Sequence, residues 1–172
     1  MSALDYLIIF VKKKETLDSI PLVQELKQKG VLRIREGNGK TLTLMKPEIW
    51  QPEFGDNWIY LLFDLFQIRS ICGQFSDVSL DVVEFASKPT IYHSPASKLV
   101  SNGPMENGVL KFSLISEPIW NKLLFQIKAP VLVNMESTEE SSLTTDLLFP
   151  LYSPETKEIY LGPEGDIKIL KG

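Results

Sequence analysis

Apolar runs and period-two alternation predict strands along most of the chain. Residues Leu4–Val11 form a continuous apolar run that ends at Lys12, which is typical of a buried strand. Val31–Arg35 and Thr41–Leu44 alternate between apolar and polar residues on either side of Gly37–Gly39, so this segment is predicted to be a hairpin. Further strands are predicted at Trp58–Phe63, Pro89–Tyr92, Leu110–Leu114, Val131–Val133, Asp146–Leu151, Glu158–Leu161 and Ile167–Leu170.

Apolar residues at helical spacing separate many of these strands. Helices are predicted over residues 19–29, 64–75, 78–85 and 116–127. Gly30 stands where the first helix must end, and Ser116 to Pro118 supply the cap and first turn of the last helix. The polar stretch Met135–Thr145 is predicted to be a loop. Strands interleaved with helices, some in hairpin order, predict a mixed β-sheet with packed helices, an α/β or α+β fold.

The chain length of 172 residues is that of one ordinary domain, so residues 1–172 are assigned to a single domain. Hydrophobic residues make up 44% and charged residues 23%, which is typical of a globular protein and excludes a disordered, collagen-like or coiled-coil chain. Inward strand positions and continuous apolar runs predict the core. These positions are Ile91, Leu110, Phe112, Leu114, Val131, Val133 and Ile169.

Charge is divided unevenly along the chain, although the net charge is only −4. Residues 1–48 carry nine Lys or Arg and six Asp or Glu, whereas residues 49–172 carry nine and sixteen. The basic residues that could bind a polyanion such as RNA are Lys12, Lys13, Lys14, Arg33, Arg35 and Lys40. The alternative is that they form an ordinary solvated face. RNA binding through them is predicted to be weak and to fall steeply with salt.

Two rare residue types limit the chemistry. Cys72 is the only cysteine, and its place in a helical apolar stripe predicts a buried, inert thiol. His93 is the only histidine, so no Cys/His zinc site is expected, and we predict that it lies in a loop. The apolar run near the start is too short for a membrane span or a secretory signal. We therefore expect no metal, no membrane contact and a cytoplasmic location.

A series of short motifs runs in a recognisable order through residues 58–172. The motifs are Lys88–Tyr92, Ala96–Asn102, Glu106–Leu114, Ala129–Val133, Ile159–Gly162 and Gly165–Leu170. They resemble the Pro-Thr-Ile-Ile-Tyr strand, the Ala-Lys-Asn-Leu and Glu-Asp-Gly segments, the Lys-Pro-Ile-Val-Ser-Thr strand and the closing strands of the YrdC-like family, the threonylcarbamoyl-adenylate synthases. By this order the chain is identified as a divergent member of that family, and its N-terminal part departs furthest.

The resemblance implies a twisted mixed sheet around a concave, basic cavity. It also implies an enzyme that joins threonine, bicarbonate and ATP into threonylcarbamoyl-AMP for the threonylcarbamoyladenosine modification of tRNA. The family has been described as binding double-stranded RNA. Thr90 keeps the residue type that the family has at its strand position, and it is the candidate nucleotide- or substrate-binding residue.

Departures from the family pattern fall on the residues that would carry the chemistry. Arg33–Gly39 replaces the Pro-Thr-Asp-Thr-x-Tyr-Gly motif, and Glu48–Asn57 replaces the Lys-Arg-x-x-x-Lys segment. Ser113 stands at the arginine of Gly-Ile-Arg-Ile. Met135–Thr138 replaces the Ser-Ala-Asn loop, and Thr156–Lys157 replaces the final Ser-Thr pair. An adenylating site needs several cations around a triphosphate and its magnesium. Their loss beside acidic residues predicts a reversed local charge and no synthase activity. The acidic residues are Glu48, Glu53, Asp56 and Glu136.

Three functions remain open. The first, which we expect, is a divergent non-catalytic YrdC-like domain that binds a small ligand, RNA or a protein partner. The second is an active L-threonylcarbamoyladenylate synthase, a nucleotidyltransferase that would use ATP and magnesium, with a relocated cation set. That set would be Lys12, Lys13, Lys14, Arg33, Arg35 and Lys40. The third is a structural or partner-binding module whose ancestral cavity is filled by side chains.

Overall fold

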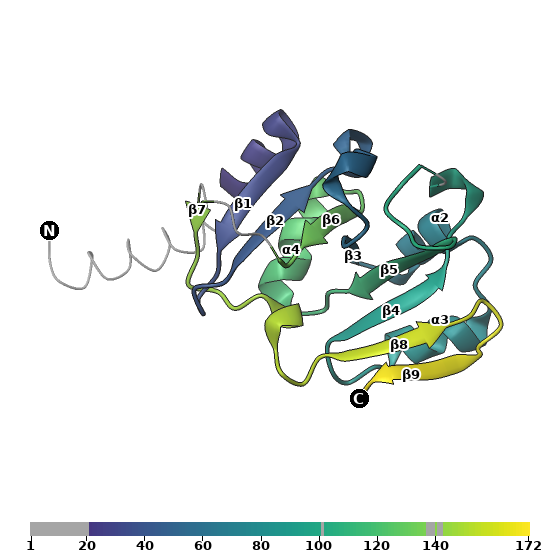
Figure 1. Ribbon diagram of the computed structural model, residues 1–172. Coiled ribbons are helices and arrows are strands. Elements are labelled where there is room, and N and C mark those ends of the chain that lie inside the picture. Colours follow the sequence, from purple (N-terminus) through teal and green to yellow (C-terminus); the bar gives the residue numbers. More distant parts are fainter. Residues whose placement is uncertain (1–20, 101, 137–139, 141–142) are drawn as a thin grey trace, which may run out of the picture.

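The computed structural model describes residues 21–100, 102–136, 140 and 143–172. Within these residues nine strands form one sheet in the order β7-β1-β2-β6-β3-β5-β4-β8-β9 (Figure 1). The strands are β1 (Val31–Arg35), β2 (Thr41–Met45), β3 (Ile59–Leu62), β4 (Thr90–Pro95), β5 (Val109–Leu114), β6 (Val131–Asn134), β7 (Leu143–Thr144), β8 (Lys157–Leu161) and β9 (Ile167–Lys171). The pairs β3–β5, β4–β8 and β1–β7 are parallel, and the other neighbouring pairs are antiparallel.

Helices connect many of these strands. They are residues 21–29, α2 (Ile68–Cys72), α3 (Asp77–Glu84) and α4 (Pro118–Ile127), with short 3-10 turns η1 (Pro47–Ile49), η2 (Pro52–Phe54), η3 (Leu65–Gln67), η4 (Lys98–Val100) and η5 (Pro150–Tyr152). The predicted single-domain α/β fold, a mixed sheet with packed helices, is confirmed. The predicted strand Leu4–Val11 and residues 19–20 of the first predicted helix lie outside the described residues. Among the described helices, none is both long and apolar enough to cross a membrane.

Local sequence signals explain where the elements end. Gly30 follows the first helix with a φ of 78°, a left-handed conformation that glycine adopts without a steric penalty. The turn of residues 36–40 joins β1 to β2, as the hairpin prediction requires. α4 begins at Pro118, and its cap is Glu117, whose carboxylate accepts a hydrogen bond from the Trp120 backbone N–H at 2.8 Å.

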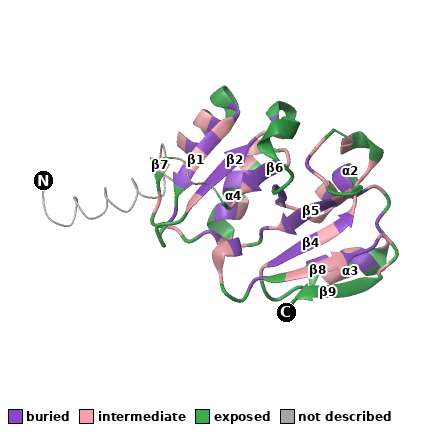
Figure 2. Ribbon diagram, in the orientation of Figure 1, coloured by how far each residue is buried: buried purple, intermediate pink, exposed green. Residues whose placement is uncertain are grey.

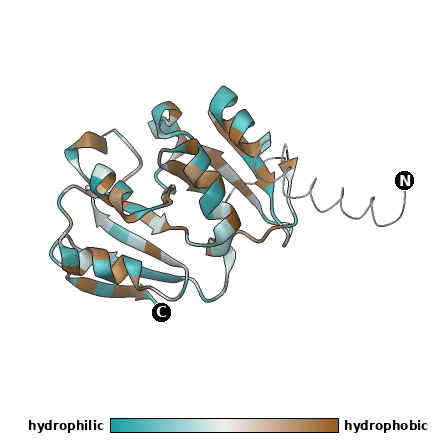
Figure 3. Ribbon diagram, turned by 180° about the vertical axis from the view of Figure 1, so that it is seen from behind, coloured by the Kyte–Doolittle hydropathy of each residue, from teal (hydrophilic) through white to brown (hydrophobic). Residues whose placement is uncertain are grey.

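The two faces of the sheet belong to two separate cores. The face that we call the α4 face packs against α4 and residues 21–29; its buried strand residues are Leu32, Ile34, Leu42, Leu44, Ile59, Leu61, Ile91, Val131 and Val133. The opposite face, the α3 face, packs against α2 and α3; its buried strand residues are Met45, Tyr60, Leu62, Tyr92, Leu110, Phe112, Leu132 and Leu161. Hydrophobic stretches accordingly mark both α3 and α4 (Figure 3).

The prediction of a strand over Asp146–Leu151 is wrong. These residues lead instead into η5, because Pro150 fixes its own φ and has no N–H for a strand ladder. Phe149 enters the core of the α4 face, where its ring centroid lies 5.1 Å from that of Trp120. The two-residue strand β7 lies within the stretch predicted to be a loop and pairs with the outer edge of β1.

The core prediction is confirmed at Ile91, Leu110, Phe112, Val131 and Val133, which are buried. It is wrong at Ile169, which is 71% exposed, and at Leu114, which is only half-buried. Ile169 is exposed because β9 is an edge strand, and all five of its residues lie open to solvent (Figure 2). The helix predicted over residues 64–75 is also shorter, since only η3 and α2 form there.

Candidate functional site

A groove of about 740 Å³ opens on the α4 face of the sheet, where Ile59 and Ile91 line it. Its rim includes the β1–β2 hairpin, the segment after β6 and the segment that follows η5. Among its lining residues are the charged side chains Lys40, Lys111, Lys171, Glu136 and Glu158. The groove therefore combines an apolar base with charges from five different parts of the chain.

Four polar side chains form a row across β5, β4, β8 and β9, which we call the polar row. Lys111 of β5 is directly opposite His93 of β4, and Glu158 of β8 is directly opposite Lys171 of β9. The two pairs are joined because His93 Nε2 lies 2.5 Å from Glu158 Oε1. His93 and Glu158 are 20% and 29% exposed, so both remain accessible to a ligand.

The groove continues past the polar row into a second hollow of about 600 Å³. Both hollows are lined by Asn57 and Lys111, and the Lys111 ammonium donates a hydrogen bond to Asn57 Oδ1 at 3.2 Å. His93 and Asp56 line the second hollow. Lys111 is therefore the cation that a ligand lying in either hollow would meet.

Tyr152 fixes the rim of the groove. Its hydroxyl donates to the backbone carbonyl oxygen of Met135 at 2.8 Å or to that of Thr41 at 3.0 Å. Burial, with a smaller contribution from the charge of Glu36, raises the pKa of Tyr152 to about 12, so this hydroxyl keeps its proton at neutral pH. The Lys40 ammonium lies 4.9 Å from the centroid of the same ring, within cation–π distance.

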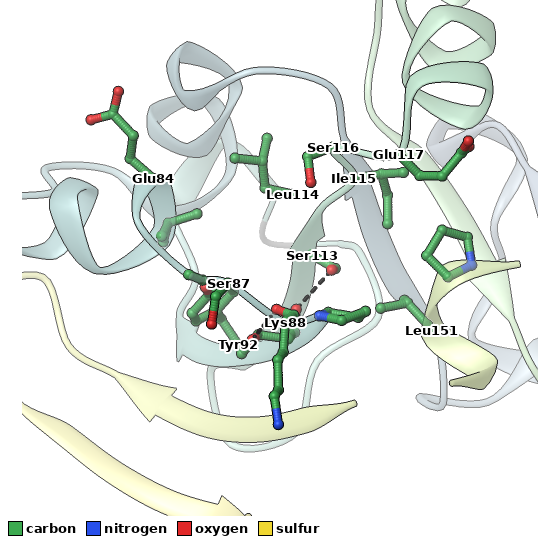
Figure 4. A pocket seen from close by; sticks show the side chains of 15 residues that line it. Glu84, Ser87, Lys88, Tyr92, Ser113, Leu114, Ile115, Ser116, Glu117 and Leu151 are labelled. Carbon is green, nitrogen blue, oxygen red and sulfur yellow. Dashed lines mark hydrogen bonds between the residues drawn. The ribbon is translucent and has the colours of Figure 1, made fainter. Parts of the chain in front are cut away.

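Thr90 lies away from this groove, in the wall of a smaller cavity of about 230 Å³ (Figure 4). Its hydroxyl donates to the Lys88 carbonyl at 2.9 Å, and its own carbonyl accepts from the Ser113 hydroxyl at 2.7 Å. Figure 4 shows that the charged ends of Glu84 and Lys88 point away from the cavity. The polar groups of Thr90 and Ser113 are thus used within the protein, and nucleotide binding by Thr90 stays a prediction.

The described basic residues of the relocated cation set, Arg33, Arg35 and Lys40, do not share one site. Lys40 lines the groove, whereas strand alternation places Arg33 and Arg35 on the face opposite Leu32 and Ile34, which is the α3 face. The remaining members of that set are Lys12, Lys13 and Lys14, which lie outside the described residues. RNA binding through these residues stays a prediction.

Sequence reasoning missed the polar row. His93 is not in a loop but in β4, and its partner Glu158 is 65 residues away in the chain. No spacing in the sequence announces such a pair. The alternation of β5 did contain a signal, because Lys111 shares its face with Ser113, the position where the family pattern has arginine. A cation therefore does lie on this face, two residues from the expected position.

The charge of the groove also differs from the expectation. Of the four acidic residues expected to reverse its sign, Glu136 lines the groove and Asp56 lines the adjoining hollow, while Glu48 and Glu53 line neither. Three lysines and two glutamates line the groove itself. Its described lining therefore has a small excess of positive charge.

Cys72 is the last residue of α2, is buried in the core of the α3 face and does not line the groove. Burial raises the pKa of its thiol to about 12, opposed by a hydrogen bond with Ser94, so the prediction of a buried thiol is confirmed. Within residues 21–100, 102–136, 140 and 143–172, no group of three or more His, Cys, Asp and Glu side chains is arranged to hold a metal ion.

Neither a protein-family model nor a curated protein matches the sequence. Solved structures do match the fold. YciO of E. coli superposes with a TM-score of 0.65 at 15% identity, over 92% of this chain and 89% of YciO. Full-length HypF, in a phosphate- and nucleotide-bound form, gives a TM-score of 0.61 at 13% identity, over 87% of this chain and 28% of HypF.

A third structure, the H234A/Y235A form of Sua5 from P. abyssi, gives a TM-score of 0.62 at 12% identity, over 87% of this chain and 52% of Sua5. This chain thus spans about a quarter of the length of HypF and about half that of Sua5. These neighbours are YrdC-like domain proteins, and the chain has the YrdC-like fold that the sequence resemblance predicted.

Proposed function

We propose that this protein, which has the YrdC-like fold, binds a small anionic ligand in the groove of the α4 face and does not catalyse threonylcarbamoyl-adenylate formation. The observation that supports binding is the open groove with Lys40, Lys111 and Lys171 on three different elements. Ammonium groups that line one groove attract a phosphate or carboxylate. The open groove of about 740 Å³ supports this proposal over the third function, in which side chains fill the ancestral cavity.

We expect no catalysis because the three lysines of the groove do not by themselves make an adenylating site. An adenylating site stabilises the charge that develops on a phosphoryl group, which requires several cations and backbone donors around it. Here Ser113 replaces the expected arginine and spends its hydroxyl on the Thr90 carbonyl. Glu136 stands in the Ser-Ala-Asn segment and brings a negative charge to the groove. Binding of a ligand remains favourable, but the transition state of nucleotidyl transfer would be poorly stabilised.

The HypF structure is named as phosphate- and nucleotide-bound, which makes ATP and inorganic phosphate the first probes to use. Calorimetric titration of the full chain should show binding of ATP, and the Lys111→Ala variant should weaken it by about fivefold to tenfold, as expected for one lost charge contact. Lys122→Ala is the matched control, because Lys122 is exposed on α4 and does not line the groove. Affinity unchanged in Lys111→Ala would place the ligand elsewhere.

The catalytic half of the proposal has its own measurement. ATP, threonine and bicarbonate with magnesium should yield no pyrophosphate above background in the presence of the full chain. Turnover that depends on the protein and on magnesium would overturn this half. Failure of ATP, phosphate and threonine to bind at all would overturn the binding half.

A further inference from the structure

His93 is the one member of the polar row whose charge can change near neutral pH. It is the only histidine of the chain, lies in β4 and has a side chain that is 20% exposed. Histidine ordinarily gains its positive charge between about pH 5 and pH 8, whereas lysine and glutamate ordinarily stay charged throughout this range. The total charge of the polar row therefore depends on the protonation of a single imidazole ring.

Glu158 determines which ring nitrogen of His93 takes up that proton. An ionised carboxylate only accepts hydrogen bonds, so the 2.5 Å contact between Glu158 Oε1 and His93 Nε2 places a proton on Nε2. A second proton must then bind at Nδ1, and it converts the neutral ring to an imidazolium. Nε2 donates to Glu158 in both forms, so the ring keeps its place while its charge changes.

Charged and titratable side chains surround His93 in the sheet and in the second hollow. They are Lys111 of β5, Glu158 and Tyr160 of β8, Lys168 and Lys171 of β9 beyond them, Asp56 before β3 and Glu106 before β5. Carboxylates, ammonium groups and phenols ordinarily keep their charge state between about pH 5.5 and pH 8. With a neutral His93 the polar row has two ammonium groups and one carboxylate, a net charge of +1, and an imidazolium raises it to +2.

We propose that His93 is a proton-dependent binding residue of the groove and its second hollow, and that its imidazolium form joins Lys111 in holding the anionic ligand. The inference rests on the binding function proposed above and adds a condition to it. Binding of the ligand takes up protons from solution, and the affinity rises as the pH falls through the range in which His93 gains its charge.

The pairing of Lys111 with His93 couples the anion to the imidazole. Side chains directly opposite each other in an antiparallel pair have Cβ atoms about 4.5–5.5 Å apart. Lys111 and His93 form such a pair, and both line the second hollow. An anion that the Lys111 ammonium binds in this hollow therefore lies beside the imidazole, and its negative charge favours the imidazolium. By linkage, the imidazolium strengthens binding of the anion by the same factor.

Exposure to water sets the size of the effect. His93 is partly exposed, and the hollow beside it is lined by exposed residues such as Asn57 and Glu106, so water reaches the site. One charge contact in such surroundings changes an affinity by about fivefold to tenfold. The affinity should therefore rise by this factor between about pH 8, where histidine is ordinarily neutral, and about pH 5.5, where it is ordinarily charged. Above about pH 8 the affinity should stay constant.

Calorimetric titration of the full chain with sulfate measures the effect, because sulfate keeps its charge over this range whereas phosphate does not. Sulfate should bind about fivefold to tenfold more tightly at about pH 5.5 than at about pH 8. His93→Gln, whose amide can still donate to Glu158, should match the unmodified chain at about pH 8 and gain less than about twofold at about pH 5.5. Lys122→Gln is the matched control and should keep the full gain, since Lys122 is exposed on α4 and lines neither hollow.

Proton uptake provides a second readout. Titration in two buffers of different ionisation enthalpy counts the protons taken up with each sulfate, and the count should reach up to about half a proton for the full chain and near zero for His93→Gln. An affinity that does not change with pH, or a His93→Gln variant weakened equally at both pH values, would overturn the inference and leave His93 a structural role. Binding of ATP without binding of sulfate would also overturn it, while the proposed binding function would stand. If neither ATP nor sulfate binds, the proposed binding function fails as well.

Discussion

The two halves of the sheet bury opposite faces. In β1 and β2 the buried apolar residues lie on the α4 face, except for Met45 at the end of β2, and Arg33 and Arg35 occupy the other face. In β5 and β4 the arrangement is largely reversed, because Leu110, Phe112 and Tyr92 lie on the α3 face and only Ile91 is buried on the α4 face. The central strands β3 and β6 bury both faces and join the two halves.

This reversal decides where a ligand site can form. A strand buried on one face leaves its alternate residues free to be polar. In the second half those residues are the members of the polar row, and they lie on the face that α4 covers only over the first half. The polar side of the groove therefore follows from a change in which face is apolar between two pairs of strands, while connecting segments form its rim.

Removing one large buried aromatic side chain from each core tests whether both halves depend on their own face. Phe112 is fully buried on the α3 face, where it stacks with Tyr92 at 5.1 Å, and Trp120 is buried on the α4 face. Phe112→Ala and Trp120→Ala should each lower the free energy of unfolding by about 3–5 kcal/mol. Denaturant titration measures this, and Phe66→Ala, at an exposed position, should change it by less than about 0.5 kcal/mol. A small effect at either core position would mean that one face alone holds the sheet.

Glu36 provides the next largest effect, and only in the first half. Its carboxylate is buried and accepts hydrogen bonds from the Asn38 N–H at 2.9 Å and the Phe149 N–H at 3.1 Å. Glu36→Ala leaves both donors without this acceptor, so the free energy of unfolding should fall by about 2–3 kcal/mol. Limited proteolysis should then cut near Leu148, which is exposed beside Phe149. Cleavage near β8 or β9 first would contradict the assignment of Glu36 to the first half.

Alkaline pH should act mainly on the core of the α3 face. Burial raises the pKa values of Tyr60 and Tyr92 from 10.0, and of Cys72 from 9.0, to about 12. The unfolded chain therefore loses these protons first as the pH rises. Their contribution to stability is complete below about pH 9 and is lost progressively up to about pH 12.

Unfolding midpoints at several pH values measure this loss. Tyr92→Phe removes one of the four groups whose pKa is raised, the fourth being Tyr152 at the groove, so stability should fall less steeply with pH than in the unmodified chain. Trp120→Phe, in the other core, should leave the slope unchanged while lowering stability at every pH. Equal slopes in the unmodified chain and in Tyr92→Phe would mean that Tyr92 ionises as easily in the folded state as in the unfolded one.

Patterns within one strand predicted the fold well, but contacts between distant strands were beyond them. The alternation of β1, β2 and β5 is local, and it predicted both the hairpin and the burial of Phe112. The exposure of Ile169 depends on strand order, since the same apolar run would be buried in a central strand. The His93–Glu158 pair likewise depends on the parallel pairing of β4 with β8, which no local pattern specifies.

The smallest expected effect concerns the basic residues of the first half. Lys40 and Arg35 are five residues apart near the β1–β2 hairpin, but only Lys40 lines the groove. Lys40→Ala should therefore weaken ATP binding by up to about fivefold, which corresponds to about 1 kcal/mol for one exposed charge. Arg35→Ala should change it by less than about twofold, because strand alternation turns Arg35 toward the opposite face.

The comparison of these two variants separates the binding proposal from the relocated synthase site. A synthase assembled from the basic residues of the first half would need Arg35 and Lys40 around the same triphosphate, and both variants would then lose binding and turnover together. Two residues on opposite faces of one sheet cannot contact one small ligand, since the sheet between them satisfies its own backbone groups and leaves no passage. Calorimetric titration of both variants under identical salt conditions decides the matter, and equal losses of affinity would show that the ligand lies at the hairpin edge instead of in the groove.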